Sequence, residues 1–505
     1  MQKTGPLYCI IPEKRRCGRN KCRHAFVLRA ESIPICRFCD IINYMTSLKK
    51  HNINMLDGPL LKNVLLFSLP IMLSNLLQIA FNAADTVIVG KFSGQRALAA
   101  VGSTGAIVGM LVSLFNGLSV GATIVLAQSL GSGVIKRIKA AVHTAYYLAL
   151  SGGLILTAAG FFLSGYLLRM TGTPEDILDQ ALLYMRIYFA GSIPLFVYNC
   201  GASVMRAKGD SVRPTMILTA TGAINVLMNL FLVIALKMDV AGVAIATVIS
   251  ESISAILVTA CLMREDDQTR LVLSEIMLDR HSLAGILTIG LPAGLQGMMW
   301  SLSNVAIQKA LNSFGSITVA GNTAAANIEE FVYIGMEGFS QSAMTFTSQN
   351  AGAKNVKRIK EILSLTTVMI TAVSFMIGAF ILWQGDSLLL LYTDDPSVIN
   401  VGKIRIKYVV FWLFLNGVLD VPSSSMRGMG YSTLPTVFML MGIVGVRLGW
   451  IYLFWNTHPT LEVLYMCFPL SWAVTTVLQF ILWSVLYRRF VRKCGLPDAS
   501  AGEGQ

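Results

Sequence analysis

The chain has 505 residues, of which 54% are hydrophobic and only 13% are charged, and its formal net charge is +13 at pH 7. Soluble domains carry about 25% charged residues, so the composition excludes an ordinary soluble protein. Apolar runs of about 20 residues recur along almost the whole chain, and each can cross a hydrocarbon core about 30 Å thick. The sequence therefore predicts an all-α polytopic membrane protein. Its positive charge is expected in loops beside the membrane and not on a nucleic-acid-binding surface.

The N-terminal segment, residues 1–54, differs from the rest. Its first 50 residues hold eleven Lys/Arg and three acids, a net charge of +8. They also hold five of the nine cysteines: Cys9, Cys17, Cys22, Cys36 and Cys39. With His24 nearby, the spacing of these cysteines allows a zinc site, but the gap between the pairs is short and no apolar core accompanies them. We expect a disordered basic tail, or residues upstream of a true start at Met45 or Met55.

Breaks between the apolar runs divide the remainder into twelve spans. They lie near residues 63–90, 98–128, 140–168, 182–205, 213–236, 241–263, 283–311, 318–350, 361–385, 402–426, 433–455 and 462–487. Several spans exceed 25 residues, which predicts tilted helices or helices that extend beyond the bilayer.

The loops predict the orientation. Lys and Arg number eighteen on one side and nine on the other, which puts both termini in the cytoplasm by the positive-inside rule. The cytoplasmic loop 264–282 then joins a lobe of residues 55–263 to a lobe of residues 283–490, with a cytoplasmic tail at 491–505.

The two lobes are repeats. The segment that starts at Gly117 and the segment that starts at Gly338 share G-x-S, Q, G and K-R-I-K at a shift of 221 residues, and the loops that begin at Arg206 and Arg427 match at the same shift. Each copy has six spans, an even number, so the copies have the same topology and are related by an axis along the membrane normal. That architecture predicts a transporter with a cavity near the midplane.

Proline marks a helix start at the same place in both repeats. Thr173-Pro174 and Asp395-Pro396 each read as a helix start with proline at its first position.

Asp85 is the most informative single residue. It is the only charge in the run from Val64 to Val89, so it lies near the middle of the first span. A charge at that depth costs roughly 2.5–3.5 kcal/mol on insertion scales, and such a residue is usually retained for function. The alternative is a structural Asp that is hydrogen-bonded between helices.

Polar side chains in the following spans extend this set. Asn199 lies in span 4, and Asn225/Asn229 and Thr247/Glu251 are i, i+4 pairs in spans 5 and 6, so each pair shares a helix face. With Asp85, their oxygens could hold Na⁺, or a partly dehydrated carboxyl could carry a proton instead. Interhelical hydrogen bonding is the alternative role.

The second half has acids inside its spans as well. Glu329, Glu330 and Glu337 lie in span 8, which predicts a wet, electronegative cavity that attracts cationic substrates, and Met299 is one of the methionines that could supply an adaptable apolar lining. The chain has no P-loop for ATP and no paired histidine ligands, so neither an ATP-driven pump, an enzyme, a metal site nor a cofactor is expected.

The motifs are those of a known family. The segments AADTVIVG, GLSVGATIVLAQ, RAKGDSVRPT and INVLMNL in the first half, with GLPAGLQG, FTSQN and RGMGYS in the second, resemble the multidrug and toxic compound extrusion (MATE) family over about residues 55–490. The resemblance implies a MATE/MOP-type fold of two six-helix repeats in the lipid bilayer of the cell. It also implies a monomeric antiporter that exports small organic cations or amphiphiles in exchange for Na⁺ or H⁺.

The resemblance also implies the sites. The cation site of the N-terminal lobe falls on Asp85, Asn199, Asn225, Asn229 and Thr247, and the expected substrate cavity is lined by Glu251, Glu329, Glu330, Met299 and Trp300. Two positions depart from the family pattern. Asn229 replaces a second site carboxylate, which leaves the coupling ion open between Na⁺ and H⁺, and the region of Trp300 lacks the Glu that some relatives carry in span 7.

Other functions stay open at this stage. The same superfamily architecture serves flippases for lipid-linked or polysaccharide precursors, for which a wide basic cavity would argue. A membrane-embedded enzyme lacks its ligand or nucleophile motifs, and a channel is disfavoured by the repeat.

Overall fold

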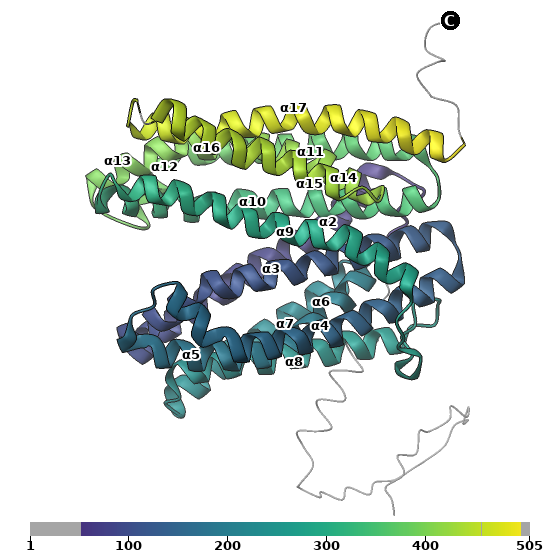
Figure 1. Cartoon of the computed structure of the whole chain (residues 1–505), viewed down its shortest axis with the longest axis horizontal. Helices are drawn as coiled ribbons and strands as arrows, with labels where there is room; N and C mark the ends of the chain where they lie inside the picture. The colour runs from purple at the N-terminus through teal and green to yellow at the C-terminus, as the bar shows by residue number, and fades with distance from the viewer. Residues whose placement is uncertain (1–51, 456, 496–505) are drawn as a thin grey trace, which may run out of the picture. The chain divides into compact units, whose positions relative to one another are not determined.

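The computed structural model describes residues 52–455 and 457–495, which form helices with no β-strand among them (Figure 1). In chain order, with η for π- or 3-10-helical turns, they are α2 (Leu60–Ile88), η1 (Val89–Ser93), α3 (Gly94–Ser132), α4 (Ile135–Met170), α5 (Glu175–Ala190), α6 (Ser192–Ala207), α7 (Val212–Leu230), η2 (Phe231–Ala235), α8 (Asp239–Met263), η3 (Leu273–Glu275), α9 (Arg280–Asn312), α10 (Ser316–Gly352), α11 (Val356–Trp383), α12 (Gly385–Leu390), α13 (Pro396–Arg405), η4 (Ile406–Val410), η5 (Phe411–Leu413), α14 (Phe414–Gly428), α15 (Thr433–Leu440), η6 (Met441–Gly445), α16 (Val446–Trp450), η7 (Ile451–Trp455) and α17 (Leu461–Lys493). The cysteine pairs of the N-terminal tail, with their zinc alternative, lie outside the described residues.

The prediction of twelve membrane helices in two six-helix repeats is confirmed. Each predicted span coincides with one helix or with a run of consecutive helices. Within the described residues, eight helical segments are long and apolar enough to cross a membrane, or nine if α5 and α6, which are bent by 45°, form one span. One of these segments, Leu60–Ser132, contains two of the predicted spans, and α10 with its three acids is not among them.

The two proline signals differ in the structure. Pro396 is the first residue of α13, and the side chain of Asp395 caps that helix by accepting a hydrogen bond of 2.8 Å from the Ser397 amide. Pro174 instead precedes α5, because its extended backbone (φ −58°, ψ 141°) places it outside the helix. The prediction was therefore right for the second repeat and one residue early for the first.

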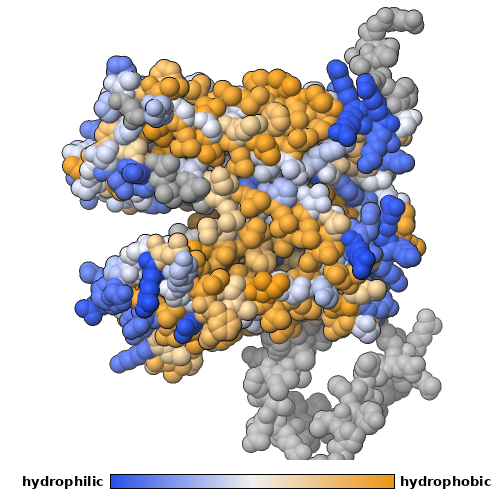
Figure 2. Space-filling view, viewed as in Figure 1, coloured by the Kyte–Doolittle hydropathy of each residue, from blue (hydrophilic) through white to orange (hydrophobic). Residues whose placement is uncertain are grey.

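The outer surface is that of a membrane protein. Large apolar side chains are exposed on most helices, among them Ile155, Phe162 and Val368. Figure 2 shows hydrophobic side chains across the middle of the visible face and hydrophilic ones gathered at its two ends. This pattern matches a hydrocarbon layer with water on both sides, so the protein is a multi-pass membrane protein.

We refer to α2–α8 as the N-lobe and to α9–α17 as the C-lobe. The first two helices of each lobe form the contact between them: α3 packs along α9 and α10, and α2 packs against α10. Small residues permit this packing. A Cβ atom at Gly117 of α3 would lie 2.3 Å from the backbone nitrogen of Gly294 in α9, and one at Gly121 would lie 2.4 Å from the carbonyl oxygen of Ile286. Glycine is required here because only backbones without side chains can approach so closely.

A second contact between the lobes is duplicated by the repeat. The side-chain amide of Gln128 in α3 donates to the carbonyl oxygen of Gly428 at 2.8 Å, and that of Gln349 in α10 donates to the carbonyl oxygen of Ala207 at 2.6 Å. Each pair is related to the other by the shift of 221 residues that relates the sequence repeats. We call these two hydrogen bonds the glutamine latch. It lies at the end of the helices where the basic loops gather, which we call the basic end.

An ion network connects loops at the basic end of the N-lobe. The Glu265 carboxylate accepts from Lys208 at 2.6 Å and lies 2.7 Å from an amino group of Arg213, while Arg213 also pairs with Asp210. Lys208 contacts Asp267 as well. Burial raises the pKa of a carboxyl, but for Glu265 the bonds from Lys208 and Arg213 outweigh burial and lower its pKa below the ordinary value. The network ties the inter-lobe loop to the α6–α7 turn.

The glycine contact predicts a mutational effect. Gly117→Ala places a methyl group against the backbone of α9, which must move away. We expect a loss of about 1–3 kcal/mol of stability, seen as a lower thermal unfolding temperature of the purified protein in detergent. Gly102→Ala is the control, because a Cβ there meets nothing within 4 Å and the change favours the helix. Equal melting temperatures for the two variants would contradict this account.

The ion network predicts a pH dependence. Glu265→Gln removes the carboxylate that Lys208 and Arg213 share, but each cation keeps a second one, Asp267 or Asp210, so we expect a cost of about 1.5–3 kcal/mol near neutral pH. The stabilisation by wild-type Glu265 is complete above the pKa of an unfolded Glu, about 4.3, and is lost as the pH falls through its lower folded pKa. The difference in stability between the two proteins should therefore begin to shrink as the pH falls below about 4.3 and vanish below the lower folded pKa of Glu265. Glu275→Gln, in the same loop but exposed, should show no such convergence.

Candidate functional site

A cavity of about 420 Å³ lies within the N-lobe and reaches α10 of the C-lobe. Four residues of the expected cation site line it, Asp85, Asn199, Asn225 and Thr247, and so does Glu251 of the expected substrate cavity. Asn229 lies behind the wall and is fully buried. The structure thus brings together the whole predicted cation set, which comes from α2, α6, α7 and α8.

Hydrogen bonds link four of these residues. The side-chain amide of Asn229 donates to Asp85 Oδ1 and, at 3.2 Å, to Asn225 Oδ1. The amide of Asn225 faces the Thr247 hydroxyl at 3.5 Å. Among the described residues, the buried side-chain oxygen of Asn229 has no hydrogen-bond partner. This group supplies one carboxylate and several amide and hydroxyl oxygens that hydrogen bonds hold close together. Such oxygens are suitable ligands for a hard cation, and the carboxyl can carry a proton instead.

Local backbone features place these side chains. Asp85 lies near the end of α2, which continues directly into the π-helical turn η1, and Asn229 lies at the end of α7, which continues into η2. Turns η1 and η2 contact each other. At Gly222 of α7, a Cβ would come within 1.8 Å of the Phe81 ring, so glycine lets α2 and α7 approach. Short π-helical stretches inside longer helices are frequent at functional sites.

The remaining wall of this cavity includes residues that sequence reasoning did not assign to a site. Asn75 of α2 donates to Glu337 Oε2 of α10 at 3.1 Å, across the lobes, and Arg206 adds a cation at the end of α6. Asn75 was detectable as a polar residue in the first apolar run. Arg206 was assigned to a loop because it lies at the end of its span.

A second cavity, of about 500 Å³, lies in the C-lobe and is lined by Trp300, Glu329, Glu330 and Glu337, among others. Three residues of the expected substrate cavity thus lie here and Glu251 lies in the N-lobe cavity. Met299 is half-buried and is not among the residues that line either cavity. The expected single lining is therefore divided between two cavities.

One acid of the C-lobe cavity, Glu329, is paired with a buried cation. Glu329 Oε2 lies 2.5 Å from the guanidinium of Arg405, which also donates to Asn322 Oδ1 at 2.6 Å. The hydroxyl of Tyr465 donates to the same Asn322 oxygen at 3.1 Å. Arg405, which the sequence indicated only as a charge near a span end, is buried in this network. The cavity is therefore of mixed charge and not simply electronegative.

Arg447 is a lining residue of this cavity that the sequence analysis missed. It lies in the run Thr433–Trp455, and it was detectable by the argument applied to Asp85, as a charge inside an apolar span.

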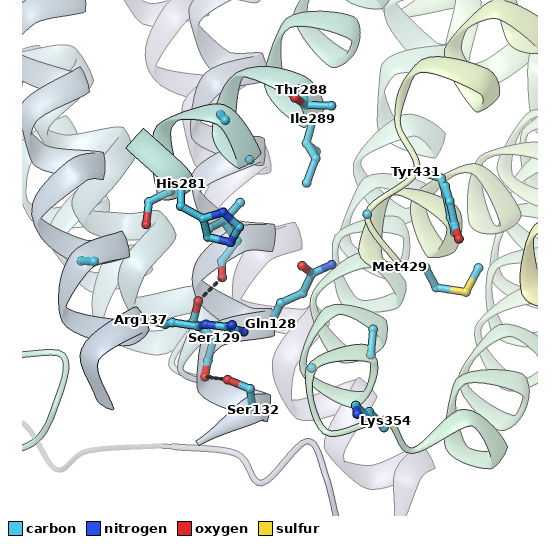
Figure 3. A pocket seen from close by; sticks show the side chains of 18 of the residues that line it. Gln128, Ser129, Ser132, Arg137, His281, Thr288, Ile289, Lys354, Met429 and Tyr431 are labelled. Atoms are coloured by element: carbon cyan, nitrogen blue, oxygen red, sulfur yellow. Dashed lines mark hydrogen bonds between the residues drawn. The ribbon is translucent and has the colours of Figure 1, made fainter. Parts of the chain in front are cut away.

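A third pocket, of about 900 Å³, lies between the lobes at the basic end (Figure 3). Gln128, Ser129 and Arg137 face it from the N-lobe side, and Lys354 and Tyr431 from the C-lobe side. It adjoins the glutamine latch, since Gln128 belongs to both. This pocket shares no lining residue with the two lobe cavities, whereas Glu337 lines both of those.

Comparisons with known proteins agree with this architecture. The chain matches the family model described as MatE over residues 70–231 and again over residues 292–453, one match in each lobe. It is 29% identical over 376 residues to the "Probable multidrug resistance protein YpnP" of Bacillus subtilis, which covers 74% of this chain and 84% of that protein. It is 26% identical over 350 residues to the "FAD transporter" of Shewanella oneidensis, which covers 68% of this chain and 77% of that protein.

A solved structure described as the outward-facing conformation of a multidrug resistance MATE family transporter of the MOP superfamily is similar with a TM-score of 0.81. It is 20% identical and covers 88% of this chain and 99% of that chain, so it shows a shared fold. With the family model matched once in each repeat, the chain belongs to the MatE family, the multidrug and toxic compound extrusion transporters.

Proposed function

We propose that the protein is a secondary active antiporter that exports small cationic or amphiphilic drugs and toxic compounds from the cytoplasm in exchange for inward Na⁺ or H⁺. The observation that carries the proposal is the hydrogen-bonded group of Asp85, Asn229, Asn225 and Thr247 on the N-lobe cavity of a MatE-family chain. Relatives named as a multidrug resistance protein and as an FAD transporter support organic molecules as the substrate class.

The coupling ion binds at Asp85. Asn229 donates its amide to Asp85, so Na⁺ or a proton arriving at the carboxylate competes with this bond and changes how α7 holds α2. An ion shifts the equilibrium between two conformations only if its affinity for them differs. The direct bond between Asp85 and Asn229 supplies such a difference, because it can form only while the two helices keep this spacing.

The glutamine latch closes one side of the transport path. By the positive-inside rule the basic end faces the cytoplasm, with both termini on that side, and the latch holds the lobes together there. Figure 2 shows the surface hollowed between the lobes at the opposite end. This combination supports a conformation that is open to the outside. We propose that the protein acts as a monomer in the cell membrane, with lobes of residues 55–263 and 283–490.

The alternative function is a flippase for lipid-linked or polysaccharide precursors. Arg405 and Arg447 in the C-lobe cavity favour it, since such precursors carry phosphates. The acids Asp85, Glu251 and Glu337 on the N-lobe cavity argue against it, because they repel phosphates. Drug antiport is therefore the better proposal, and it requires no cofactor.

Replacing Asp85 tests the coupling. Asp85→Asn removes the negative charge but keeps a side chain of the same shape, so the protein should insert normally while ion-driven efflux falls to the level of empty vesicles. The measurement is dye efflux from reconstituted vesicles under an imposed Na⁺ or H⁺ gradient, which also identifies the ion.

Asp176→Asn, an exposed acid at the start of α5, is the matched control and should transport normally. Normal gradient-driven efflux by Asp85→Asn would refute the coupling role.

The latch can be tested separately. Changing Gln128 and Gln349 together to Leu removes two hydrogen bonds that are worth about 1–3 kcal/mol in total, so conformations open at the basic end should gain population. Spin labels at Lys136→Cys and Lys354→Cys, in a background without other reactive cysteines, should report a longer mean distance. If the distance distribution is unchanged in the double variant, the latch does not hold this end closed.

A further inference from the structure

Arg447 is a buried cation in the middle of a membrane span. It belongs to α16, a five-residue helix between the π-helical turns η6 and η7, and its side chain is 1% exposed. It nevertheless lines the C-lobe cavity of about 500 Å³. An ionisable residue at such a position is a functional-site hypothesis by default, and the question is which partner it binds.

Within the described residues, the polar partners of Arg447 are too few for a guanidinium. Its Nε donates to the Ser471 hydroxyl at 3.2 Å, and its buried Nη1 has no hydrogen-bond partner. Aromatic rings surround it: the guanidinium carbon lies 4.4 Å from the ring centre of Phe468, 5.8 Å from that of Trp300 and 5.9 Å from that of Trp472. Cation–π contacts stabilise the charge but do not satisfy the N–H donors.

The neighbouring charges do not balance Arg447. The buried carboxylate of Glu329 pairs with Arg405, so two buried guanidiniums share one buried acid. Glu330 and Glu337 line the same cavity, but both are exposed to it, and Glu337 accepts a hydrogen bond from Asn75. The cavity therefore has a positive group with free donors deep in its aromatic wall and an acid, Glu330, at its surface.

We propose that Arg447 binds an anionic group of the substrate, a carboxylate or sulfonate attached to an aromatic ring. The planar guanidinium can form two parallel hydrogen bonds to such a group. Trp300 and Phe468 supply the apolar contact for the ring, and Glu330 faces a positive group elsewhere on the same molecule. This inference rests on the proposed transport function, because it names the substrate of the same cavity.

The competing role for Arg447 is structural, as a cation held by three aromatic rings to pack α16 against α17. That role would not distinguish a ligand with a carboxylate from one without it. A pair of ligands that differ only in this group separates the two roles.

The probes are a rhodamine dye with a free benzoate and the methyl ester of the same dye. Equilibrium binding to the purified protein is measured by fluorescence polarisation for wild type, Arg447→Gln and Arg447→Lys. We expect wild type to bind the benzoate about tenfold more tightly than the ester, and Arg447→Gln to lose that preference while it still binds the ester. Arg447→Lys keeps the charge without the planar fork and should retain part of the preference.

Arg186→Gln is the matched control, because Arg186 also lies in a membrane helix and stacks on an aromatic ring, Phe161, but lines neither cavity. It should keep the wild-type preference. Thermal unfolding of each variant identifies any that does not fold, and Arg447→Lys serves if Arg447→Gln fails.

Two outcomes would overturn the inference: equal affinity of wild type for the two dyes, or an equal loss of both dyes in the Arg447 variants. Efflux of the ester from vesicles tests the proposed antiport independently. Failed efflux with preserved benzoate preference would reject the transport mechanism and leave the anion site in place.

Discussion

The absence of water from the hydrocarbon core is the constraint on which this structure depends. A polar or charged group there must find its partner within the protein. The chain satisfies this requirement in pairs that cross between helices, such as Asn229 with Asp85 and Arg405 with Glu329. Among the buried side-chain atoms without a hydrogen-bond partner in the described residues, the oxygen of Asn229 adjoins the N-lobe cavity and Nη1 of Arg447 belongs to a residue that lines the C-lobe cavity.

The repeat explains the contacts that both lobes share but not the polar residues that line their cavities. Gln128 and Gln349 are equivalent by the shift of 221 residues and make equivalent bonds across the lobes. The same shift relates Arg447 to Val226, Asn225 to Val446 and Asn229 to Trp450, whereas Asn199 corresponds to Asp420. Most polar residues of the proposed cation site are therefore not repeated in the other lobe. Duplication thus preserved the contacts that close the basic end, and the two cavities diverged around them.

The sequence predicted the spans and the pairing of the repeats because hydrophobic length and a constant offset are local or linear signals. It also singled out polar residues that the structure places beside Asp85 or on the same cavity, since polar residues in apolar spans are few and tend to face inward. Their role in cation binding stays a prediction. It did not predict the bond between Glu329 and Arg405, because that pair depends on how α10 packs against α13, far away in the chain. The sequence also did not predict the π-helical turns after Asp85 and Asn229, because such turns arise from packing and have no distinct composition. Arg447 differs from these cases, because a charge inside the apolar run 433–455 is visible in the sequence itself.

The contact between Asn75 and Glu337 connects the two cavities in physical terms. Asn75 and Asp85 are on the same helix, α2, so a displacement of α2 moves both. Glu337 lines the N-lobe cavity and the C-lobe cavity, and its carboxylate accepts from Asn75 at 3.1 Å. A displacement of α2 relative to α10, of the kind that the proposed ion binding at Asp85 would cause, can lengthen this bond and so change the hydrogen bonding of the carboxylate that faces both cavities. A hydrogen bond to a charged group is worth about 1.5–3 kcal/mol, and that is enough to alter an affinity by about tenfold or more. This contact between the lobes is therefore a route by which the proposed ion site and the proposed substrate site can influence each other.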